Sequence, residues 1–321
     1  MAKVVVAGAG VFGTSVSERL AWNTDNEVWI HTIEGDVCVD INQNHRNTKY
    51  FPTRFLNQSI KASMDYDVFA DADVVLLVIP SKVIVPFANE MKKHIKKGNN
   101  PLIINLAKGM SDEGAFLTEK IPFSRTASMK GPTFAIETLN GFPTAFTFGG
   151  KREDYKWFKH TILPGTGFSL DYSSDVRAVE LLSILKNMYA IAIGLVSGKY
   201  NSPNVDFLVY TKAVNEMRRL LKHYECDPET IFRYCGIGDL GLTSLNDLSR
   251  NRTFGMLIGK GFKYDEDQGA TVIEGKRTIK LIGEQAKQWQ ESDEDFPLVT
   301  ALYKLMYEGS SLQDYIVSAL S

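Results

Sequence analysis

Short runs of β-branched and apolar residues alternate with amphipathic segments through the first half of the chain. Residues 3–7 form one such run, and apolar residues then recur at helical spacing from 11 to 22. Residues 27–31 again have the composition of a strand, so the chain is expected to open with a β-α-β unit. Further buried strands are predicted at 73–79, 101–106, 126–129 and 144–148, with helical segments such as 84–96 between them. This alternation predicts an α/β domain with a doubly wound (Rossmann-type), mainly parallel sheet.

The pattern changes after about Tyr172, where β-branched runs give way to long helical periodicities. These periodicities predict helices at residues 175–198, 206–223 and 271–290. The second half is therefore expected to be an all-α domain. The boundary is placed near Ser173 to Asp175, which gives domains at 1–174 and 175–321.

Composition limits the partners that the chain can have. With 321 residues, 44% hydrophobic and 23% charged, it can bury a large core. A formal net charge of -2 gives no long-range attraction to nucleic acid, so an anionic ligand must be captured by a local basic site. Cys38, Cys226 and Cys235 are odd in number and widely spaced, which favours a reducing cytosol and a cytoplasmic location.

Membrane and metal sites are not expected. No secretion signal follows Met1, and the longest helical apolar stretch, Met188 to Val196, is shorter than the roughly 20 residues of a spanning helix. This favours a soluble protein. The five histidines have no metal-like spacing, so no metal is predicted; they are His31, His45, His94, His160 and His223.

A glycine pattern follows the first expected strand directly. It consists of Gly8, Gly10 and Gly13, with Val11 and Phe12 between the last two. In such a pattern the first glycine permits a tight turn, the second lets the backbone approach a pyrophosphate, and the third lets the helix pack on the strand. Because the pattern ends a strand and opens a helix, it predicts a dinucleotide site. A purely structural glycine turn is the alternative.

The choice between NAD and NADP depends on the residues after the second strand. A carboxylate there accepts from the ribose 2′-hydroxyl, whereas an arginine binds a 2′-phosphate. Residues 31–36 contain no arginine or lysine, and Glu34 lies 21 positions beyond Gly13, close to the usual offset. NAD is therefore favoured over NADP. A Glu34 that is simply solvated in a loop is the alternative.

Lys186 lies in a segment, residues 181–191, that is apolar all round. An ordinary solvated lysine does not fit there, so its amino group is expected to meet a cavity or a partner. A lysine of this kind can donate or accept a proton. Asp239 lies among glycines and apolar residues, where a solvated aspartate is not expected, and it is the simplest candidate partner for Lys186. The alternatives are a lysine that reaches out to water and an aspartate that caps a helix.

Two further basic sites suit a small anion. Ser249-Arg250-Asn251-Arg252 offers a guanidinium, an amide and a hydroxyl within four residues, a set that matches a phosphate dianion. Lys108 directly follows an expected strand, so it emerges at the edge of the sheet where open α/β sheets bind ligands. A solvated surface cluster and a surface or helix-capping lysine are the respective alternatives.

These residues, in this order, resemble the NAD(P)-dependent glycerol-3-phosphate dehydrogenases, especially the bacterial soluble type. The likeness spans Gly8 to Gly275 and is much more specific than the opening glycines. The matching stretches are His45-x-Asn47-x-x-Tyr50-Phe51-Pro52, Gly131-Pro132-Thr133-Phe134-Ala135-x-Glu137, Leu185-Lys186-Asn187, Asp239 with Thr243, Ser249-Arg250-Asn251-Arg252-x-Phe254-Gly255 and Val272-x-Glu274-Gly275.

The resemblance implies reversible reduction of dihydroxyacetone phosphate at C2, a reaction that supplies a glycerophospholipid precursor. Lys186 matches the catalytic lysine, Asp239 would orient it, and Lys108 would help to hold the substrate. The implied substrate residues are Lys108, Gly131, Thr133, Asn187, Thr243, Ser249, Arg250 and Asn251. The implied cofactor residues are Gly8, Gly10, Val11, Phe12, Gly13, Thr32, Lys108, Ala135, Arg250, Val272 and Glu274. A homodimer is also expected from the resemblance.

The chain departs from the family pattern at Ser183 and Ile184, where the family commonly has two glycines shortly before its lysine. A related dehydrogenase of another small phosphorylated or anionic hydroxyketone is therefore the first alternative. Dehydrogenases of 3-hydroxy acids place an asparagine four residues after the lysine, where this chain has Ala190. A catalytically silent, dinucleotide-binding redox sensor is the alternative from another class.

Overall fold

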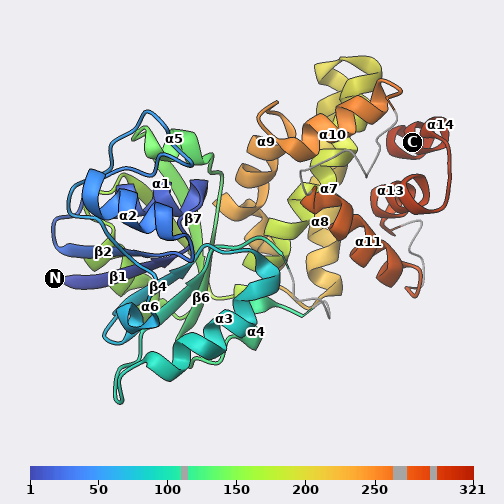
Figure 1. Ribbon diagram of the computed structural model, residues 1–321. Helices are drawn as coiled ribbons and strands as arrows, with labels where there is room; N and C mark the ends of the chain where they lie inside the picture. Colours follow the sequence, from blue (N-terminus) through green and yellow to red (C-terminus); the bar gives the residue numbers. More distant parts are fainter. Residues whose placement is uncertain (110–114, 263–272, 290–294) are drawn as a thin grey trace. The chain divides into compact units, whose positions relative to one another are not determined.

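The computed structural model describes residues 1–109, 115–262, 273–289 and 295–321. The chain forms two compact units, Met1–Val176 and Arg177–Ser321 (Figure 1). The division lies two residues beyond the predicted boundary. Each unit has a different architecture, and each is described by itself below.

Unit 1 is built on one eight-stranded sheet with the strand order β3-β2-β1-β4-β5-β6-β7-β8. Every neighbouring pair is parallel except β6 and β7, which are antiparallel. The strands are β1 (Ala2–Ala7), β2 (Asn26–His31), β3 (Lys61–Ser63), β4 (Val74–Leu77), β5 (Leu102–Asn105), β6 (Thr126–Lys130), β7 (Thr144–Gly149) and β8 (Phe168–Ser173). The order reverses between β1 and β4, which confirms the predicted doubly wound fold.

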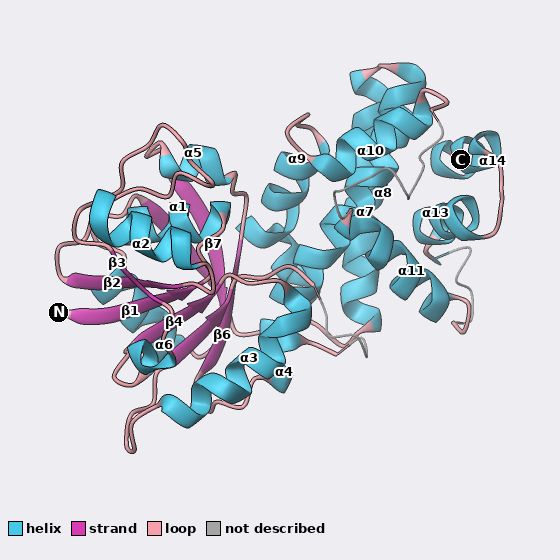
Figure 2. Ribbon diagram, in the orientation of Figure 1, coloured by secondary structure: helices cyan, strands magenta, loops and turns pink. Residues whose placement is uncertain are grey.

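Helices cover both faces of this sheet (Figure 2). Alternation along β1 explains why: Val4 and Val6 join one apolar cluster, whereas Val5 and Ala7 join the other. The first cluster packs under α1 (Val11–Leu20), α2 (Gly35–Asn44), α5 (Ala135–Leu139) and α6 (Arg152–Trp157). The second packs under α3 (Ser81–His94) and α4 (Leu117–Lys120). A strand buried on both sides reads as a continuous apolar run, as β1 does.

Two strands were not predicted, β3 and β8. β3 has only three residues, too few to show a period. In β8 the polar residues Ser169 and Asp171 alternate with apolar ones, a weaker signal than the solid apolar runs of the central strands.

The described part of unit 2 contains helices and no strand, as predicted. Its helices are α7 (Val176–Tyr200), α8 (Pro203–His223), α9 (Asp239–Ser244), α10 (Arg250–Gly259), α11 (Glu274–Ala286), α13 (Pro297–Tyr307) and α14 (Leu312–Leu320), with short helical turns at 228–232 and 234–238. The helix expected at 271–290 is observed as α11, while residues 271, 272 and 290 lie outside the described residues. Helices α9, α10, α13 and α14 were not predicted.

Helix α7 is the core of unit 2, and its residues 178–197 are all buried. It contains an 18-residue window with a mean hydropathy of 1.6, entirely buried inside the protein. The prediction that no apolar helix reaches spanning length was therefore wrong on length. The helix is apolar all round because other elements surround it on every side.

Four glycines bring the backbones of α7 and α10 into contact. A Cβ added at Gly194 would collide with the carbonyl oxygen of Arg252, and one added at Gly255 would collide with that of Ile191. The next turn repeats the arrangement with Gly198 and Gly259. We call this contact the glycine seam. It fixes the spacing between the helix that carries Lys186 and the helix that begins with Arg250.

A buried carboxylate, Glu216 of α8, holds the start of α13. It accepts hydrogen bonds from the backbone N–H groups of Leu298 (2.8 Å) and Val299 (3.2 Å) and from the hydroxyl of Tyr189 (2.6 Å). These N–H groups belong to the first turn of α13, where helices lack internal partners. Burial raises the pKa of Glu216 from its usual 4.5 to about 7.

Candidate active site

The glycine loop between β1 and α1 is shaped by two different constraints. Gly8 has a φ of +117°, and a Cβ there would lie 2.5 Å from the carbonyl oxygen of Val78, while a Cβ at Gly13 would collide with the carbonyl oxygen of Gly8. The protein's own packing therefore requires both glycines. At Gly10, by contrast, an added Cβ would meet nothing within 4 Å. This open space, beside a helix N-terminus without a side-chain cap, fits a pyrophosphate.

Asn47 holds this loop by hydrogen bonds, a role that the sequence did not suggest. Its side-chain amide is fully buried and donates to the carbonyl oxygen of Ala9 (2.8 Å) and the hydroxyl of Thr14 (2.8 Å). Thr14 in turn donates to the same carbonyl (2.9 Å). The only signal was its place in the matched stretch that begins at His45.

The segment after β2 forms an ion pair that could not be predicted from residues 31–36, because the partner lies outside them. Glu34 pairs with the amino group of Lys49 and accepts from the hydroxyl of Tyr50 (3.0 Å). Its backbone N–H donates to the hydroxyl of Thr32 (3.1 Å), which is buried. Glu34 is therefore half-buried and held in place by two contacts, while its role toward the ribose stays a prediction. Residues 31–36 contain no lysine or arginine, and Lys49 supplies the positive charge beside them.

Lys108 leaves the carboxyl end of β5 through a constrained turn. The next residue, Gly109, has a φ of +141°, and a Cβ there would lie 2.7 Å from the Ser81 hydroxyl at the start of α3. Lys108 itself is half-buried. The loop after β6 is also tight, because a Cβ at Gly131 would collide with the carbonyl oxygen of Ala145. Thr133 donates back to the Gly131 carbonyl (3.3 Å), and Ala135 opens α5.

In unit 2 the amino group of Lys186 forms an ion pair with Oδ1 of Asp239. Only 1% and 2% of their side chains are exposed, so the alternative of a lysine that reaches water is wrong. Thr243 contacts the same carboxylate oxygen (3.4 Å), one turn along α9. The other oxygen, Oδ2, is buried with no hydrogen-bond partner among the described residues. The pair predicted from the apolar helix is confirmed.

The residues that depart from the family pattern lie one turn before this lysine. Ser183 and Ile184 are 1% and 4% exposed, and the Ser183 hydroxyl donates to the carbonyl oxygen of Glu180 (2.7 Å). The hydroxyl is thus satisfied within its own helix.

A chain of amides links three of the predicted site residues. Asn251 donates to the carbonyl oxygen of the Asn187 side chain (3.0 Å), and Asn187 donates to the carboxylate of Glu274 (3.0 Å). The oxygen of Asn251 accepts from the backbone N–H of Gly275 (3.0 Å). Helices α7, α10 and α11 are tied together by these bonds. Val272, predicted with Glu274, lies outside the described residues.

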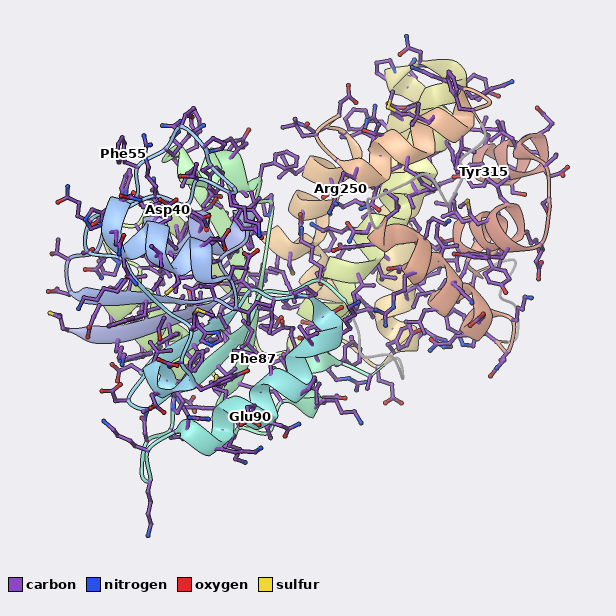
Figure 3. All side chains as sticks on the ribbon, viewed as in Figure 1. Asp40, Phe55, Phe87, Glu90, Arg250 and Tyr315 are labelled. Atoms are coloured by element: carbon purple, nitrogen blue, oxygen red, sulfur yellow. The ribbon has the colours of Figure 1, made fainter. Side chains whose placement is uncertain are left out.

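The two arginines at the start of α10 have different surroundings. Arg250, the first residue of the helix, is exposed (Figure 3). Arg252 is 9% exposed and donates to Ser197 (3.0 Å), the carbonyl of Ser244 (2.6 Å) and Asp247 (3.1 Å). Ser249 caps the helix by accepting from the N–H of Arg252 (3.3 Å). Of these two arginines, Arg250 is the one exposed to solvent, a distinction that spacing alone could not make.

Within the described ranges, no group of three or more His, Cys, Asp or Glu side chains could hold a metal ion. None of the three cysteines forms a disulfide, and Cys226 and Cys235 are buried.

A glycine-loop sheet domain followed by a helical domain with a buried lysine–aspartate pair defines the class of two-domain, nicotinamide-dependent dehydrogenases. Family models of NAD-dependent glycerol-3-phosphate dehydrogenase match both parts, the N-terminal one over residues 3–156 and the C-terminal one over 175–317. The chain belongs to the NAD-dependent glycerol-3-phosphate dehydrogenase family.

Individual relatives agree with this assignment. The glycerol-3-phosphate dehydrogenase (NAD(P)+) of Leuconostoc citreum is 30% identical over 100% of this chain and 97% of the relative. That of Methanothermobacter thermautotrophicus is 30% identical over 98% and 96%. The crystal structure of a glycerol-3-phosphate dehydrogenase from Coxiella burnetii superposes with a TM-score of 0.86 at 26% identity, covering 100% of this chain and 99% of that one.

Proposed function

We propose that this chain catalyses the reversible NAD(P)H-dependent reduction of dihydroxyacetone phosphate to sn-glycerol 3-phosphate. The observation that carries the proposal is the buried pair of Lys186 and Asp239 in the same unit as an exposed arginine at a helix N-terminus. The first supplies a proton donor, and the second supplies an anchor for a phosphate. Family membership supports the same reaction.

The dinucleotide would be held by the glycine loop at Gly8, Gly10 and Gly13 together with the first turn of α1. The space beside Gly10 and the uncapped N-terminus of α1 fit the charge and the bulk of a pyrophosphate. When bound, the nicotinamide supplies the hydride that reduces the substrate carbonyl.

Lys186 would act on the substrate oxygen. Its amino group gives a proton to the oxygen at C2 as negative charge develops there, and it takes the proton back in the reverse direction. Asp239 holds this amino group in one place, because its ion pair is buried and Thr243 contacts the same carboxylate. On unit 1, Lys108 would help to hold the substrate.

The N-terminus of α10 would hold the phosphate of the substrate. Arg250 offers a planar pair of donors that fits two phosphate oxygens, and the helix terminus adds partial positive charge. The amide of Asn251 is oriented by Asn187 and Gly275, and its second N–H is directed by these bonds. Ser249 can donate its hydroxyl proton while it caps the helix.

We further propose that NADH is preferred over NADPH. Glu34 is held by Lys49 and Tyr50 at the end of β2, where a carboxylate accepts from a ribose 2′-hydroxyl and repels a 2′-phosphate. Lys49 compensates part of this charge, so the expected preference is modest. A homodimer and a cytoplasmic location stay predictions; light scattering of the purified protein measures the first.

The test is the initial rate of NADH and, separately, NADPH oxidation with dihydroxyacetone phosphate, beside unphosphorylated dihydroxyacetone. We expect a rate that requires the phosphate and a lower KM for NADH. Dinucleotide binding without turnover would refute the proposal and indicate a different hydroxyketone or a silent sensor.

A matched pair of variants then tests the phosphate anchor. Arg250→Ala should raise the KM for dihydroxyacetone phosphate by about tenfold or more, because a charge-assisted hydrogen bond contributes about 1.5–3 kcal/mol. The control, Arg218→Ala, removes a partly exposed arginine of α8 that pairs with Glu229. An unchanged KM in Arg250→Ala would remove Arg250 from the substrate site.

A further inference from the structure

Lys130, the last residue of β6, is a buried lysine. It belongs neither to the glycine loop nor to the ion pair of Lys186 and Asp239. Only 3% of its surface is exposed. Its amino group donates to the carbonyl oxygens of Asn105 (2.8 Å) and Ala107 (2.7 Å). A lysine is costly to bury unless its donors are satisfied, and these two bonds satisfy two of its three N–H donors.

One carbonyl belongs to the last residue of β5 and the other to the turn that leads from β5 to Lys108. The side chain of Asn105 accepts from the N–H of Ala107 (2.9 Å), and the hydroxyl of Ser128 donates to the carbonyl of Asn105 (3.3 Å). Lys130 therefore completes a brace of side chains around residues 105–107. Asn105 and Ser128 are fully buried, so water does not compete with these bonds.

The residue that follows this brace is Lys108, and the residue after that is fixed as well. Gly109 has a φ of +141° and lies against Ser81, which leaves the backbone on both sides of Lys108 with little freedom. An apolar residue at position 130 would fill the same space in the sheet and leave the two carbonyls without the lysine donor. The sheet itself does not need this amino group, because β6 pairs with β5 and β7 through its backbone.

We propose that Lys130 is a positioning residue, which fixes the backbone at Lys108 and so sets where the Lys108 amino group meets the substrate. This inference rests on the proposed function. Lys130 itself touches no substrate in this scheme. Its effect on catalysis must therefore pass through Lys108.

A double-mutant cycle tests this dependence. Lys108→Met should lower kcat/KM for dihydroxyacetone phosphate by about 100-fold or more, and Lys130→Met by about tenfold or more, since small misplacements of a substrate-holding group cost up to about 100-fold. The double variant should lie within about twofold of Lys108→Met alone. NADH binding should be retained in Lys130→Met, because the glycine loop is unchanged. Losses that multiply in the double variant, or no loss in Lys130→Met, would overturn the proposal.

The matched control is Lys3→Met, which removes a lysine near the amino end of β1, where it pairs with Asp71 (2.5 Å). It should leave kcat/KM unchanged. If Lys130→Met does not fold, Lys130→Gln, which keeps one donor group, enters the same cycle with the same criterion.

A measurement without substrate separates this inference from the proposed function. Hydrogen exchange of the peptide 102–109 should be faster in Lys130→Met than in the wild type and Lys3→Met. If the wild type fails to reduce dihydroxyacetone phosphate, the proposed function fails, while faster exchange still supports the brace. Unchanged exchange overturns the brace whatever the activity.

Discussion

The ion pair of Lys186 and Asp239 gives a prediction that separates stability from catalysis. Asp239→Asn keeps the shape of the side chain but removes its charge, so the buried amino group of Lys186 loses its carboxylate. Breaking one side of a buried ion pair costs about 3–5 kcal/mol. For a domain of roughly 150 residues, each kcal/mol lowers the Tm by about 2–4 °C, so we expect a fall of about 10 °C.

Replacing both residues should have the opposite consequence for stability. Lys186→Met together with Asp239→Leu removes both charges and fills the site with apolar groups of similar size. Buried ion pairs replaced in this way are often neutral or stabilising, because two desolvation costs disappear. The double variant should therefore regain most of the lost Tm, while its turnover stays at least about 100-fold below the wild type.

The assay is thermal unfolding of the wild type, Asp239→Asn, the singles Lys186→Met and Asp239→Leu, and the double variant in one buffer, with NADH binding as a check that unit 1 is intact. We expect the two substitutions together to lower the Tm by less than the sum of their separate effects. The reasoning fails if Asp239→Asn melts within about 2 °C of the wild type, or if the double variant loses the sum of the single losses.

Three further predictions concern Glu216, the glycine seam and the glycine loop. Because burial raises the folded-state pKa of Glu216 to about 7, above its usual 4.5, its contribution to stability is present below pH 4.5 and is lost as the pH rises through 7. The free energy of unfolding should fall by about 3 kcal/mol over this range. Glu216→Gln should flatten this part of a profile of Tm against pH, and a profile that matches the wild type would contradict the assignment to Glu216. Gly194→Ala should destabilise by about 1–3 kcal/mol in urea titrations, since its Cβ meets the Arg252 carbonyl, and a wild-type midpoint would show that the glycine seam can open freely. Gly10→Ala should keep the wild-type Tm but weaken NADH binding by about tenfold or more, whereas Gly13→Ala should lower both; equal NADH affinity in Gly10→Ala would place the pyrophosphate elsewhere.

The sequence predicted best those features whose cause is local. The opening β-α-β unit follows from a run of apolar residues, three glycines and a helical period within about thirty residues. Lys186 was also predictable, because a lysine inside a helix that is apolar on every side needs a partner, and Asp239 was the carboxylate in similarly apolar surroundings.

The supports of the site could not be predicted in this way, because their partners lie far along the chain. Asn47 reaches Ala9 across 38 positions, and Lys130 reaches Asn105 across 25. Lys49 pairs with Glu34 across 15 positions and supplies a cation that the local segment lacks. Apart from the place of Asn47 in the matched stretch that begins at His45, no local sequence feature distinguishes these residues from ordinary surface residues.

The glycine seam sets a fixed distance within unit 2. Lys186 and Arg250 are on helices whose main chains touch, so the span between the proton donor and the phosphate anchor is set by backbone thickness and not by adjustable side chains. In the proposed reaction, that span must equal the distance from the C2 oxygen to the phosphate of a three-carbon substrate. A change of preferred substrate length would then require residues larger than glycine in the seam, and not merely a wider pocket.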